Sequence, residues 1–334
     1  MARAFICGCA GTELSDDERA FLREARPWGL ILFKRNVADR EQLRALTDAF
    51  RDTLGSDDAP VLVDQEGGRV QRMGPPHWPA YPAAARFDPE IRGERALAAA
   101  RLVARLMARD LREVGITVDC APVLDVADAE THAAIGTRSY SRFPERVAAF
   151  GRAVIEGLLE GGVAPVVKHA PGHGRARVDS HYELPVVAAS RTELAARDFA
   201  PFRALRDAPM AMTAHVVYGA VDPDRPATTS REVIQTIVRE AIGFDGLLMT
   251  DDLSMKALGG PLSERARAAF AAGVDIALHC NGDLAEAREV AAASPELEGA
   301  ARERAEAALR RIARTTAPFD VAKGRAELAG YGLG

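Results

Sequence analysis

The residues best able to carry out chemistry are Asp251, at the end of a short apolar segment, and the pair Asp179 and His181. Because positions two apart in an extended chain face the same way, Asp179 can hydrogen-bond the imidazole of His181, fix its tautomer and raise its basicity. An imidazole with a pKa of about 6.5 can donate and then accept a proton near neutral pH. A carboxylate nucleophile beside such a proton donor is the arrangement that a retaining glycosidase requires.

A second set of polar residues can hold a substrate. Lys168 and His169 close an apolar segment, where a charge is costly unless it meets a carboxylate or a ligand. Asp64 closes another, and the two glycines that follow allow the backbone to turn and bring Arg72 back toward it. We expect these four side chains at one site. Asp252, which follows the candidate nucleophile, is expected only to cap the next turn.

Groups at these positions need a common scaffold, and the rest of the sequence predicts one. Short apolar segments alternate with amphipathic helical segments, which indicates a parallel sheet covered by helices. Eight such units favour a closed (β/α)8 barrel over a doubly wound open sheet, and we expect residues 1–334 to form this single TIM-type domain. The predicted strands are 4–9, 29–33, 60–64, 116–121, 163–168, 210–214, 246–250 and 274–278.

Two of the predicted helices have clear beginnings. Ser15 with Glu18 and Ser190 with Glu193 form capping boxes, each at the start of an amphipathic segment. After the eighth strand we expect only one or two helices and a tail that ends in glycine. The helical segments before that point are 18–26, 40–54, 94–114, 145–160, 193–205, 231–241 and 264–271.

The chemistry of such a barrel lies at the carboxyl ends of its strands. All seven histidines fall in or just beyond strand ends on that side, and none falls in a predicted helix. We therefore expect them to form a polar crown around the mouth. The segment 75–89 contains five prolines together with Trp78 and Tyr81, and we expect it to lie over the same mouth.

Composition and charge exclude several classes of partner. A net charge of −5 gives no electrostatic footprint for nucleic acid or anionic lipid. No apolar run approaches the roughly 18 residues that span a bilayer, and the apolar segment 4–10 is too short for a secretory signal. The four cysteines form no CxxC pair and lie in strand-like segments, so we expect them to be buried and reduced. These features predict a cytoplasmic protein that binds neither nucleic acid nor membrane.

Other functions of a barrel fit less well. A metal-dependent amidohydrolase also gathers His, Lys and Asp at strand ends, but it normally carries an HxH pair in the first strand, and residues 4–9 contain none. A phosphate-binding aldolase or isomerase needs a Schiff-base lysine within a strand and a glycine-rich cradle after the last strands, and we find neither. A sugar-binding regulator on an inactive barrel is disfavoured, because the candidate nucleophile Asp251 and the candidate proton donor His181 are both present.

Five motifs in consistent order give the sequence a resemblance to the family 3 glycoside hydrolases. Within that family it resembles the bacterial β-N-acetylglucosaminidases of peptidoglycan recycling, the NagZ group. The likeness extends from about Phe5 to about Cys280. The motifs are Val63-Asp64-Gln-Glu-Gly-Gly-Arg-Val-Gln-Arg72, Gly136-Thr-Arg138-Ser-Tyr, Lys168-His169-Ala-Pro-Gly-His-Gly, Asp179-Ser-His181 and Thr250-Asp251-Asp252-Leu-Ser-Met.

The resemblance implies roles for eight residues. Asp251 is implied as the nucleophile, and Asp179 with His181 as the acid/base pair. Other members of the family take a catalytic carboxylate from a second domain, whereas the resemblance here is to the single-domain form. The implied substrate-binding residues are Asp64, Arg72, Arg138, Lys168 and His169.

The resemblance also implies a reaction and a substrate. The implied substrate is GlcNAc-anhydroMurNAc, with or without its peptide, hydrolysed in the cytoplasm without metal or cofactor by an enzyme that we expect to be a monomer. Some relatives transfer the sugar to phosphate instead, and a neutral His181 would not repel that anion as a carboxylate would, so phosphorolysis stays open. If His181 only binds, the acid must be sought among Asp125, Glu66 and His215.

The sequence departs from the family pattern beside the acid/base pair. The family usually has phenylalanine where this chain has Ala170, and Asp-Thr where it has Arg175 and Ala176. The lost ring removes packing beneath the loop, and the added arginine changes the charge there. With two glycines and little apolar content, the segment 170–178 is expected to be among the least ordered parts of the mouth.

Overall fold

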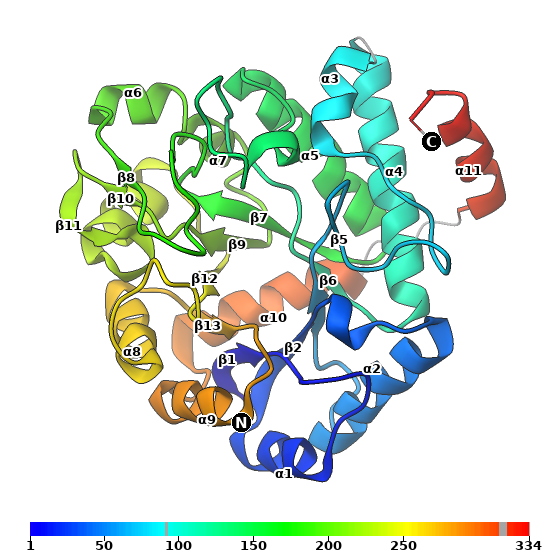
Figure 1. Cartoon of the computed structure of the whole chain (residues 1–334), viewed down its shortest axis with the longest axis vertical. Coiled ribbons are helices and arrows are strands. Elements are labelled where there is room, and N and C mark those ends of the chain that lie inside the picture. Colours follow the sequence, from blue (N-terminus) through cyan, green and yellow to red (C-terminus); the bar gives the residue numbers. More distant parts are fainter. Residues whose placement is uncertain (91–92, 314–318, 334) are drawn as a thin grey trace.

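The computed structural model describes residues 1–90, 93–313 and 319–333, and it contains a closed barrel of eight parallel strands (Figure 1). Every neighbouring pair around the barrel is parallel. The predicted (β/α)8 barrel is therefore confirmed, and the doubly wound alternative, which would leave two open edges, is wrong. In order around the barrel the strands are β1 (Arg3–Cys7), β2 (Pro27–Leu32), β3 (Val61–Val63), β6 (Val118–Asp119), β7 (Ala164–Ala170), β9 (Met210–Thr213), β12 (Leu247–Asp252) and β13 (Ile276–His279).

The fourth barrel strand, β6, is much shorter than the predicted segment 116–121. Pro122 has no N–H to donate, so the regular ladder with β7 ends before it. Pairing resumes beyond the proline, where the N–H of Leu124 donates to the carbonyl oxygen of Lys168 at 2.6 Å. This irregular continuation carries the chain to Asp125, at the carboxyl end of the barrel.

Helices cover each connection between barrel strands and form an outer ring (Figure 1). Both predicted capping boxes are present. The predicted helix 193–205 is two shorter helices, because Pro201 lies in the first turn of the second and cannot continue the first. The ring consists of α1 (Asp16–Ala25), α2 (Arg40–Leu54), α4 (Glu94–Glu113), α5 (Pro144–Glu160), α6 (Arg191–Ala196), α7 (Ala200–Ala204), the π-type helix η5 (Val233–Ala241), α8 (Leu262–Ala272) and α9 (Leu284–Ala293).

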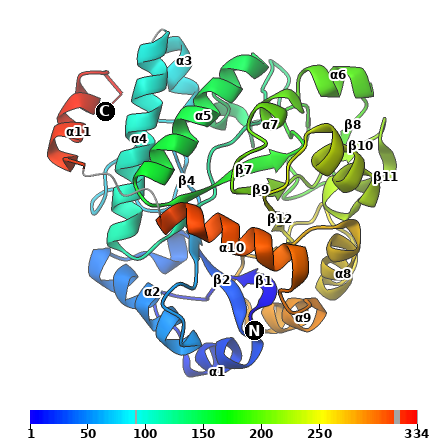
Figure 2. The ribbon, with the colours of Figure 1, turned by 180° about the vertical axis from the view of Figure 1, so that it is seen from behind.

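Apolar side chains at alternate strand positions fill the barrel. Ile6 of β1, Leu62 of β3 and Val166 of β7 are buried in one cluster with their counterparts on the other strands. Leu297 and Ala305 join this cluster from α10 (Gly299–Ala313) and the residues before it. Figure 2 shows α10 lying across the barrel on the side away from the view of Figure 1. The amino-terminal end of the barrel is thus closed, and the carboxyl end is the open one.

Two small sheets, which the sequence analysis did not predict, stand at the carboxyl end. β4 (Gln65–Gly67) and β5 (Val70–Gln71) form an antiparallel hairpin directly after β3. β8 (Val186–Val187) and β10 (Val217–Tyr218) pair in parallel, and β11 (Asp222–Pro226) completes the second sheet. These strands position the loops that surround the open end.

The proline-rich segment 75–89 does not cover the mouth, so that prediction is wrong. Trp78 is buried with the guanidinium of Arg40 against its ring, and the hydroxyl of Tyr81 donates to Asp110 in α4 at 2.6 Å. The segment ends in η2 (Ala84–Arg86) and α3 (Phe87–Glu90). Its aromatic rings are buried against the helix layer, because apolar area is stabilising there and not at an open mouth.

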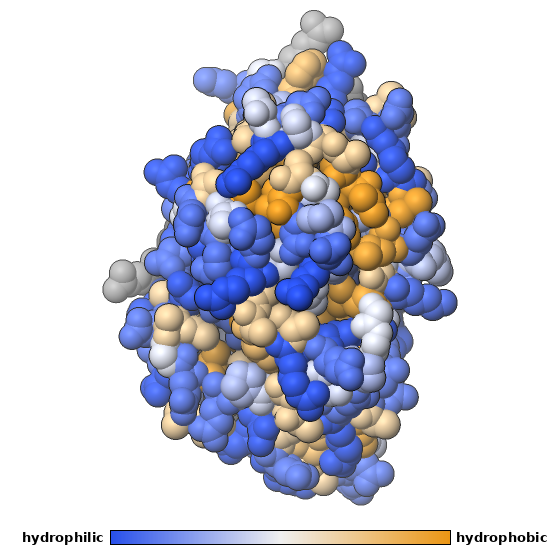
Figure 3. Space-filling model, turned by 90° about the vertical axis from the view of Figure 1, so that its left-hand side faces the viewer, coloured by the Kyte–Doolittle hydropathy of each residue, from blue (hydrophilic) through white to orange (hydrophobic). Residues whose placement is uncertain are grey.

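Outside the barrel, the chain ends in more helix than predicted. Three helices follow β13 in the described chain, namely α9, α10 and α11 (Val321–Ala329). The last of them lies against α4, where Arg325 pairs with Asp110 at 3.0 Å. All four cysteines are free and buried, as predicted. No helix among the described residues is both long and apolar enough to cross a membrane. Hydrophilic residues dominate the face that carries α6, α8 and β11 (Figure 3).

Candidate active site

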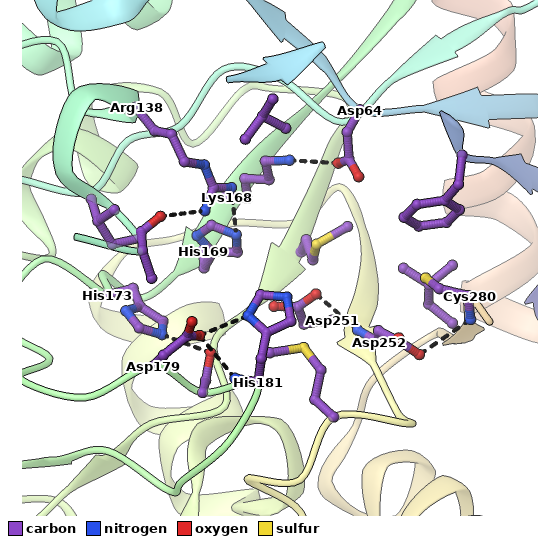
Figure 4. A pocket seen from close by; sticks show the side chains of 18 of the residues that line it. Asp64, Arg138, Lys168, His169, His173, Asp179, His181, Asp251, Asp252 and Cys280 are labelled. Atoms are coloured by element: carbon purple, nitrogen blue, oxygen red, sulfur yellow. Dashed lines mark hydrogen bonds and ion pairs between the residues drawn. The ribbon is translucent and has the colours of Figure 1, made fainter. Parts of the chain in front are cut away.

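A cavity of about 280 Å³ opens at the carboxyl ends of the barrel strands (Figure 4). This volume lies just below the roughly 300–1,000 Å³ of sites for drug-sized ligands, and it suits a single sugar ring. Side chains from β7 and β12 meet there with others from the loops that follow the strands. All eight residues to which the resemblance gives a role line this cavity: Asp64, Arg72, Arg138, Lys168, His169, Asp179, His181 and Asp251.

One wall of the cavity is a chain of alternating charges. Arg72 Nη2 donates to Asp64 Oδ2 at 2.9 Å. Lys168 Nζ bridges two carboxylates, at 2.7 Å from Asp64 Oδ1 and 2.6 Å from Glu66 Oε1. Arg138 completes the chain with two hydrogen bonds of 2.8 Å to the carboxylate of Glu66. The predicted meeting of Lys168 with a carboxylate is confirmed, and Glu66 is a member that the sequence analysis did not place in the binding set.

The hairpin after β3 explains how this wall forms. Gly67 and Gly68 have φ values of 88° and 60°, which favour glycine, and they turn β4 into β5. The side chain of Gln65 then accepts the backbone N–H of Arg72 at 3.0 Å, which fixes the return of the chain. The predicted turn that brings Arg72 back to Asp64 is confirmed.

Burial and pairing act in opposite directions on the pKa values of this wall. Burial alone would raise the pKa of Asp64 and Glu66, but Lys168 together with the neighbouring arginines lowers both. Burial would lower the pKa of Lys168, but the two carboxylates raise it. The groups therefore stay charged near neutral pH. A fixed array of charges can hold hydroxyl groups without reorganising during a reaction.

Asp251 lies near the end of β12 with its carboxylate on the cavity (Figure 4). Its Oδ1 accepts the backbone N–H of Asp252 at 2.8 Å. Burial would raise the pKa of Asp251, but the nearby imidazoles of His169 and His215 and this N–H lower it. The carboxylate is therefore ionised at neutral pH, which is the state that a nucleophile needs.

Asp252 turns its carboxylate away from that position. Its Oδ1 accepts the backbone N–H groups of Ser254 at 3.0 Å and Cys280 at 3.1 Å, and Oδ2 accepts the hydroxyl of Ser254 at 2.6 Å. The prediction that Asp252 caps the turn after the strand is confirmed.

Asp179 and His181 form the predicted pair. His181 Nδ1 lies 2.7 Å from Asp179 Oδ1, and the backbone N–H of His181 donates to the same oxygen at 3.0 Å. Because an ionised carboxylate only accepts, Nδ1 carries the proton of the neutral ring and Nε2 remains available to a ligand. Burial would raise the pKa of Asp179, but these contacts with His181 lower it. The His181 side chain is 62% exposed, so it can exchange protons with solvent.

The segment 170–176, which leads from β7 toward His181, is packed into the protein. Ala176 is fully buried, and a Cβ on Gly174 would overlap the carbonyl oxygen of Val126. For residues 170–176 the prediction of a loosely held segment is wrong. Low apolar content does not reveal a close approach between two backbones, which is what holds Gly174.

Arg175 ties the same segment to the helix layer. Its Nε donates to Asp198 Oδ2 at 2.7 Å, and Asp198, between α6 and α7, is 1% exposed. Burial raises the pKa of Asp198, although Arg175 acts to lower it. The arginine that departs from the family pattern thus pairs with a buried carboxylate, whereas Arg177, two residues later, is exposed.

We expect Arg175→Ala to loosen the attachment of the loop that carries His181. The variant leaves Asp198 buried without its ion partner, which is costly. Hydrogen exchange of residues 176–183 should rise, and kcat should fall roughly 10- to 100-fold, because small misplacements of a reacting group are expensive. Arg177→Ala is the matched control, since exposed ion pairs contribute little. Identical exchange and turnover in the two variants would contradict an anchoring role.

Three further polar side chains at the carboxyl end are already engaged. Glu66 is held in the charged wall, and Asp125 is fully buried. His215 is bonded at both ring nitrogens, with Nδ1 2.7 Å from Thr228 Oγ1 and Nε2 2.9 Å from the carbonyl oxygen of Asp252. Burial lowers the pKa of His215. These contacts leave His181 as the most accessible of the proton donors considered from the sequence.

The predicted crown of seven histidines is only partly present. His77, His132, His215 and His279 do not line the cavity in the described chain. His279 instead turns outward to Glu286 in α9, with Nε2 3.0 Å from Oε2, because a strand end alone does not decide which side a residue faces. Among the described residues, no three His, Cys, Asp or Glu side chains are placed to hold a metal ion. The histidines that do line the cavity are His169, His173 and His181.

Known proteins are similar to this sequence over most of its length. Residues 7–315 match the model of the glycosyl hydrolase family 3 N-terminal domain. The chain is 43% identical over 294 residues to a β-hexosaminidase of Methylococcus capsulatus, and the alignment covers 85% of this chain and 86% of that protein.

Solved structures share the fold. NagZ from Neisseria gonorrhoeae, in complex with N-trifluoroacetyl-D-glucosamine, is 34% identical with a TM-score of 0.86, over 99% of this chain and 98% of that one. A family 3 β-N-acetylglucosaminidase from Paenibacillus sp. str. FPU-7 is 31% identical with a TM-score of 0.84, over 98% of this chain and 67% of that one.

Proposed function

Because this chain belongs to glycosyl hydrolase family 3, as a glycosidase of the β-hexosaminidase type, we propose that it removes a terminal β-linked N-acetylglucosamine by retaining hydrolysis. The observation that carries the proposal is that an ionised Asp251 and the Asp179–His181 pair line one cavity sized for a single sugar. Family membership also sets aside the amidohydrolase and the inactive regulator.

In the first step Asp251 attacks the anomeric carbon while the bond from that carbon to the leaving oxygen breaks. His181, protonated at both ring nitrogens, gives its Nε2 proton to that oxygen, and Asp179 stabilises the imidazolium and holds its orientation. The products are a free aglycone with a hydroxyl group and a glycosyl ester on Asp251, with inverted configuration at the anomeric carbon.

In the second step water attacks the same carbon and the ester bond to Asp251 breaks. The neutral Nε2 of His181 takes the proton from the water, so that both residues return to their starting states. Two inversions give net retention of the β configuration.

The charged wall binds the sugar in this proposal. Asp64 accepts from hydroxyl groups, while Lys168 and Arg138 donate to them, and His169 lies beside Arg138. Arg72 holds Asp64 in place through its 2.9 Å hydrogen bond. The wall supplies both donors and acceptors, as a polyhydroxylated substrate requires.

The substrate that we propose is GlcNAc-anhydroMurNAc, with or without its peptide, in peptidoglycan recycling. The resemblance to the NagZ group supports this choice, and the similar structure that contains N-trifluoroacetyl-D-glucosamine supports an N-acylated glucosamine. We expect residues 1–334 to act as one catalytic unit and as a monomer, in the cytoplasm, without metal or cofactor.

Product analysis tests this proposal. The purified chain is incubated with GlcNAc-anhydroMurNAc, with and without inorganic phosphate, and Asp251→Ala serves as the inactive control. We expect free GlcNAc and anhydroMurNAc in both cases. GlcNAc 1-phosphate in the presence of phosphate would show that the enzyme is a phosphorylase instead.

Discrimination at the 2-position of the sugar gives a second test. A site that hydrogen-bonds the 2-acetamido group should prefer the nitrophenyl glycoside of GlcNAc over that of glucose by at least about 100-fold in kcat/KM, because unpaired polar groups in the site penalise the analogue. Comparable kcat/KM values for the two glycosides would indicate a broad β-glucosidase.

A further inference from the structure

A second aspartate–histidine pair, which the proposed mechanism does not use, lies at the wall of the cavity. His169 Nδ1 lies 2.7 Å from Asp125 Oδ2. His169 lines the cavity, whereas Asp125 lies behind it and does not. In contrast to the exposed His181, the side chains of His169 and Asp125 are 7% and 0% exposed. So little exposure does not suit a group that must exchange protons with solvent, and it points to another function.

The partners of the two ring nitrogens determine the tautomer of His169. An ionised carboxylate only accepts, so the Nδ1 that faces Asp125 carries a proton. Nε2 lies 3.5 Å from Arg138 Nη2, and a guanidinium only donates, so Nε2 is the unprotonated nitrogen. Figure 4 shows the ring of His169 facing Arg138 within the cavity wall. Because 3.5 Å is longer than a normal hydrogen bond, the lone pair of Nε2 can still accept from a ligand hydroxyl.

Asp125 is itself fixed by several donors. Its Oδ1 accepts the backbone N–H groups of His173 at 2.6 Å and His169 at 3.2 Å, in addition to the ring contact at Oδ2. Burial would raise the pKa of Asp125, but His169 and His173 lower it to about 2. The carboxylate is thus ionised and cannot turn a proton toward His169.

Arg138 supplies a complementary group beside this ring. One N–H of Nη2 is given to Glu66, which leaves a second N–H on the same nitrogen next to His169 Nε2. A hydroxyl group both donates and accepts, so one sugar hydroxyl can donate to His169 Nε2 and accept from Arg138.

We propose that Asp125 is a positioning residue, which sets His169 as the hydrogen-bond acceptor for a hydroxyl of the bound sugar. The inference rests on the proposed glycosidase function and adds to it a residue that lies outside the cavity. Asp125 acts through the ring of His169 and touches neither the substrate nor the reacting atoms.

Asp125→Asn tests this assignment. The amide keeps an oxygen for the N–H of His173 but presents an NH2 group to His169, so the ring must switch to the Nε2–H tautomer. That proton would face Arg138, and Nε2 could no longer accept a hydrogen bond from the sugar hydroxyl. We expect kcat/KM for the nitrophenyl glycoside of GlcNAc to fall roughly 10- to 100-fold, mainly through KM, as when the partner that orients a functional histidine is lost.

Asp119 provides the matched control. It is also fully buried, and it is the last residue of β6, six positions before Asp125. Its Oδ1 accepts the N–H of Gln65 at 3.0 Å, its Oδ2 has no hydrogen-bond partner among the described residues, and burial raises its pKa well above the ordinary value. Asp119→Asn keeps an oxygen that can accept the N–H of Gln65, so its kcat/KM should stay close to that of the wild type.

The tautomer is measured directly from ¹⁵N shifts of labelled histidine, with His169 assigned by the signal lost in His169→Ala. We expect Nδ1–H in the wild type and Nε2–H in Asp125→Asn. In a His169→Ala background, Asp125→Asn should cause little further loss, because it acts through the absent ring.

Two results would overturn the assignment. One is an Nε2–H tautomer of His169 in the wild type, a measurement that does not require any variant at Asp125 to fold. The other is a loss of kcat/KM from Asp125→Asn that is as large in the His169→Ala background as in the wild type. Failure of the proposed function is separate, because it would appear as absent turnover of GlcNAc glycosides by the wild type.

Discussion

Asp251→Ala is expected to lower kcat by roughly 10⁴-fold or more, because it removes the group that forms the covalent intermediate. The variant should still fold. The Asp251 side chain lies on an open cavity, and its removal costs one hydrogen bond, from the N–H of Asp252. Turnover of the nitrophenyl glycoside of GlcNAc, measured beside the thermal melting curve, separates loss of chemistry from loss of structure.

A slow 5-fluoro-glycosyl substrate identifies the nucleophile independently of any variant. It should leave a covalent label on Asp251, which peptide mass spectrometry can locate. Label on Asp252, Asp125 or Asp64 would contradict the assignment. Asp252 is the sharpest alternative, because it is adjacent in sequence, but its carboxylate is occupied by Ser254 and by the N–H of Cys280.

The barrel could be predicted from the sequence because its pattern is local. Each barrel strand is a short apolar run, and each is followed by a segment with helical periodicity, so the order of elements can be read without knowing any long-range contact. The ends of the strands were less predictable. The strand predicted at 116–121 is shortened because the ladder breaks at Pro122, beyond which pairing is irregular.

The features that the sequence did not predict depend on distant partners. β8 and β10 have two residues each and exist only because Val186 and Val217 are brought together by the barrel. The packed segment 170–176 is similar, since its stability depends on Arg175 meeting Asp198 and on a backbone contact at Gly174. Composition within a segment carries no information on such contacts.

The candidate site was predicted to different degrees. The eight residues with an implied role, all of which line the cavity, were identified from motifs, and Asp179 with His181 also from their spacing. Glu66 had a readable signal, since it follows Asp64 by two positions in an extended stretch and can face the same way. No signal in the sequence identified Asp125 as the partner of His169, because the two residues are 44 positions apart and meet beyond the irregular end of β6.

His181→Ala should reduce the cleavage of a GlcNAc disaccharide far more than that of the nitrophenyl glycoside. A sugar leaving group needs a full proton as the bond breaks, whereas nitrophenolate needs little. A positioned acid contributes typically about 10²–10⁴-fold, so a loss of that size is expected for the disaccharide and a small one for the aryl substrate. The quantity to compare is kcat/KM, because it reports the step in which the leaving group departs.

Two variants in the same loop make this test specific. Asp179→Ala should show the same preference in milder form, because it disturbs only the orientation and basicity of the imidazole. Tyr182→Ala is the control, since Tyr182 is adjacent to His181, is 73% exposed and does not line the cavity. It should leave both substrates nearly unaffected.

The differential loss is the decisive feature, because a folding defect would lower kcat/KM for both substrates together. Equal losses in His181→Ala with an unchanged melting curve would mean that His181 binds the substrate and does not protonate the leaving group. The alternatives considered from the sequence, Asp125, Glu66 and His215, are each held by other partners. One of those pairs would then have to open during the reaction, and the variant that abolished disaccharide cleavage while sparing the aryl glycoside would identify which.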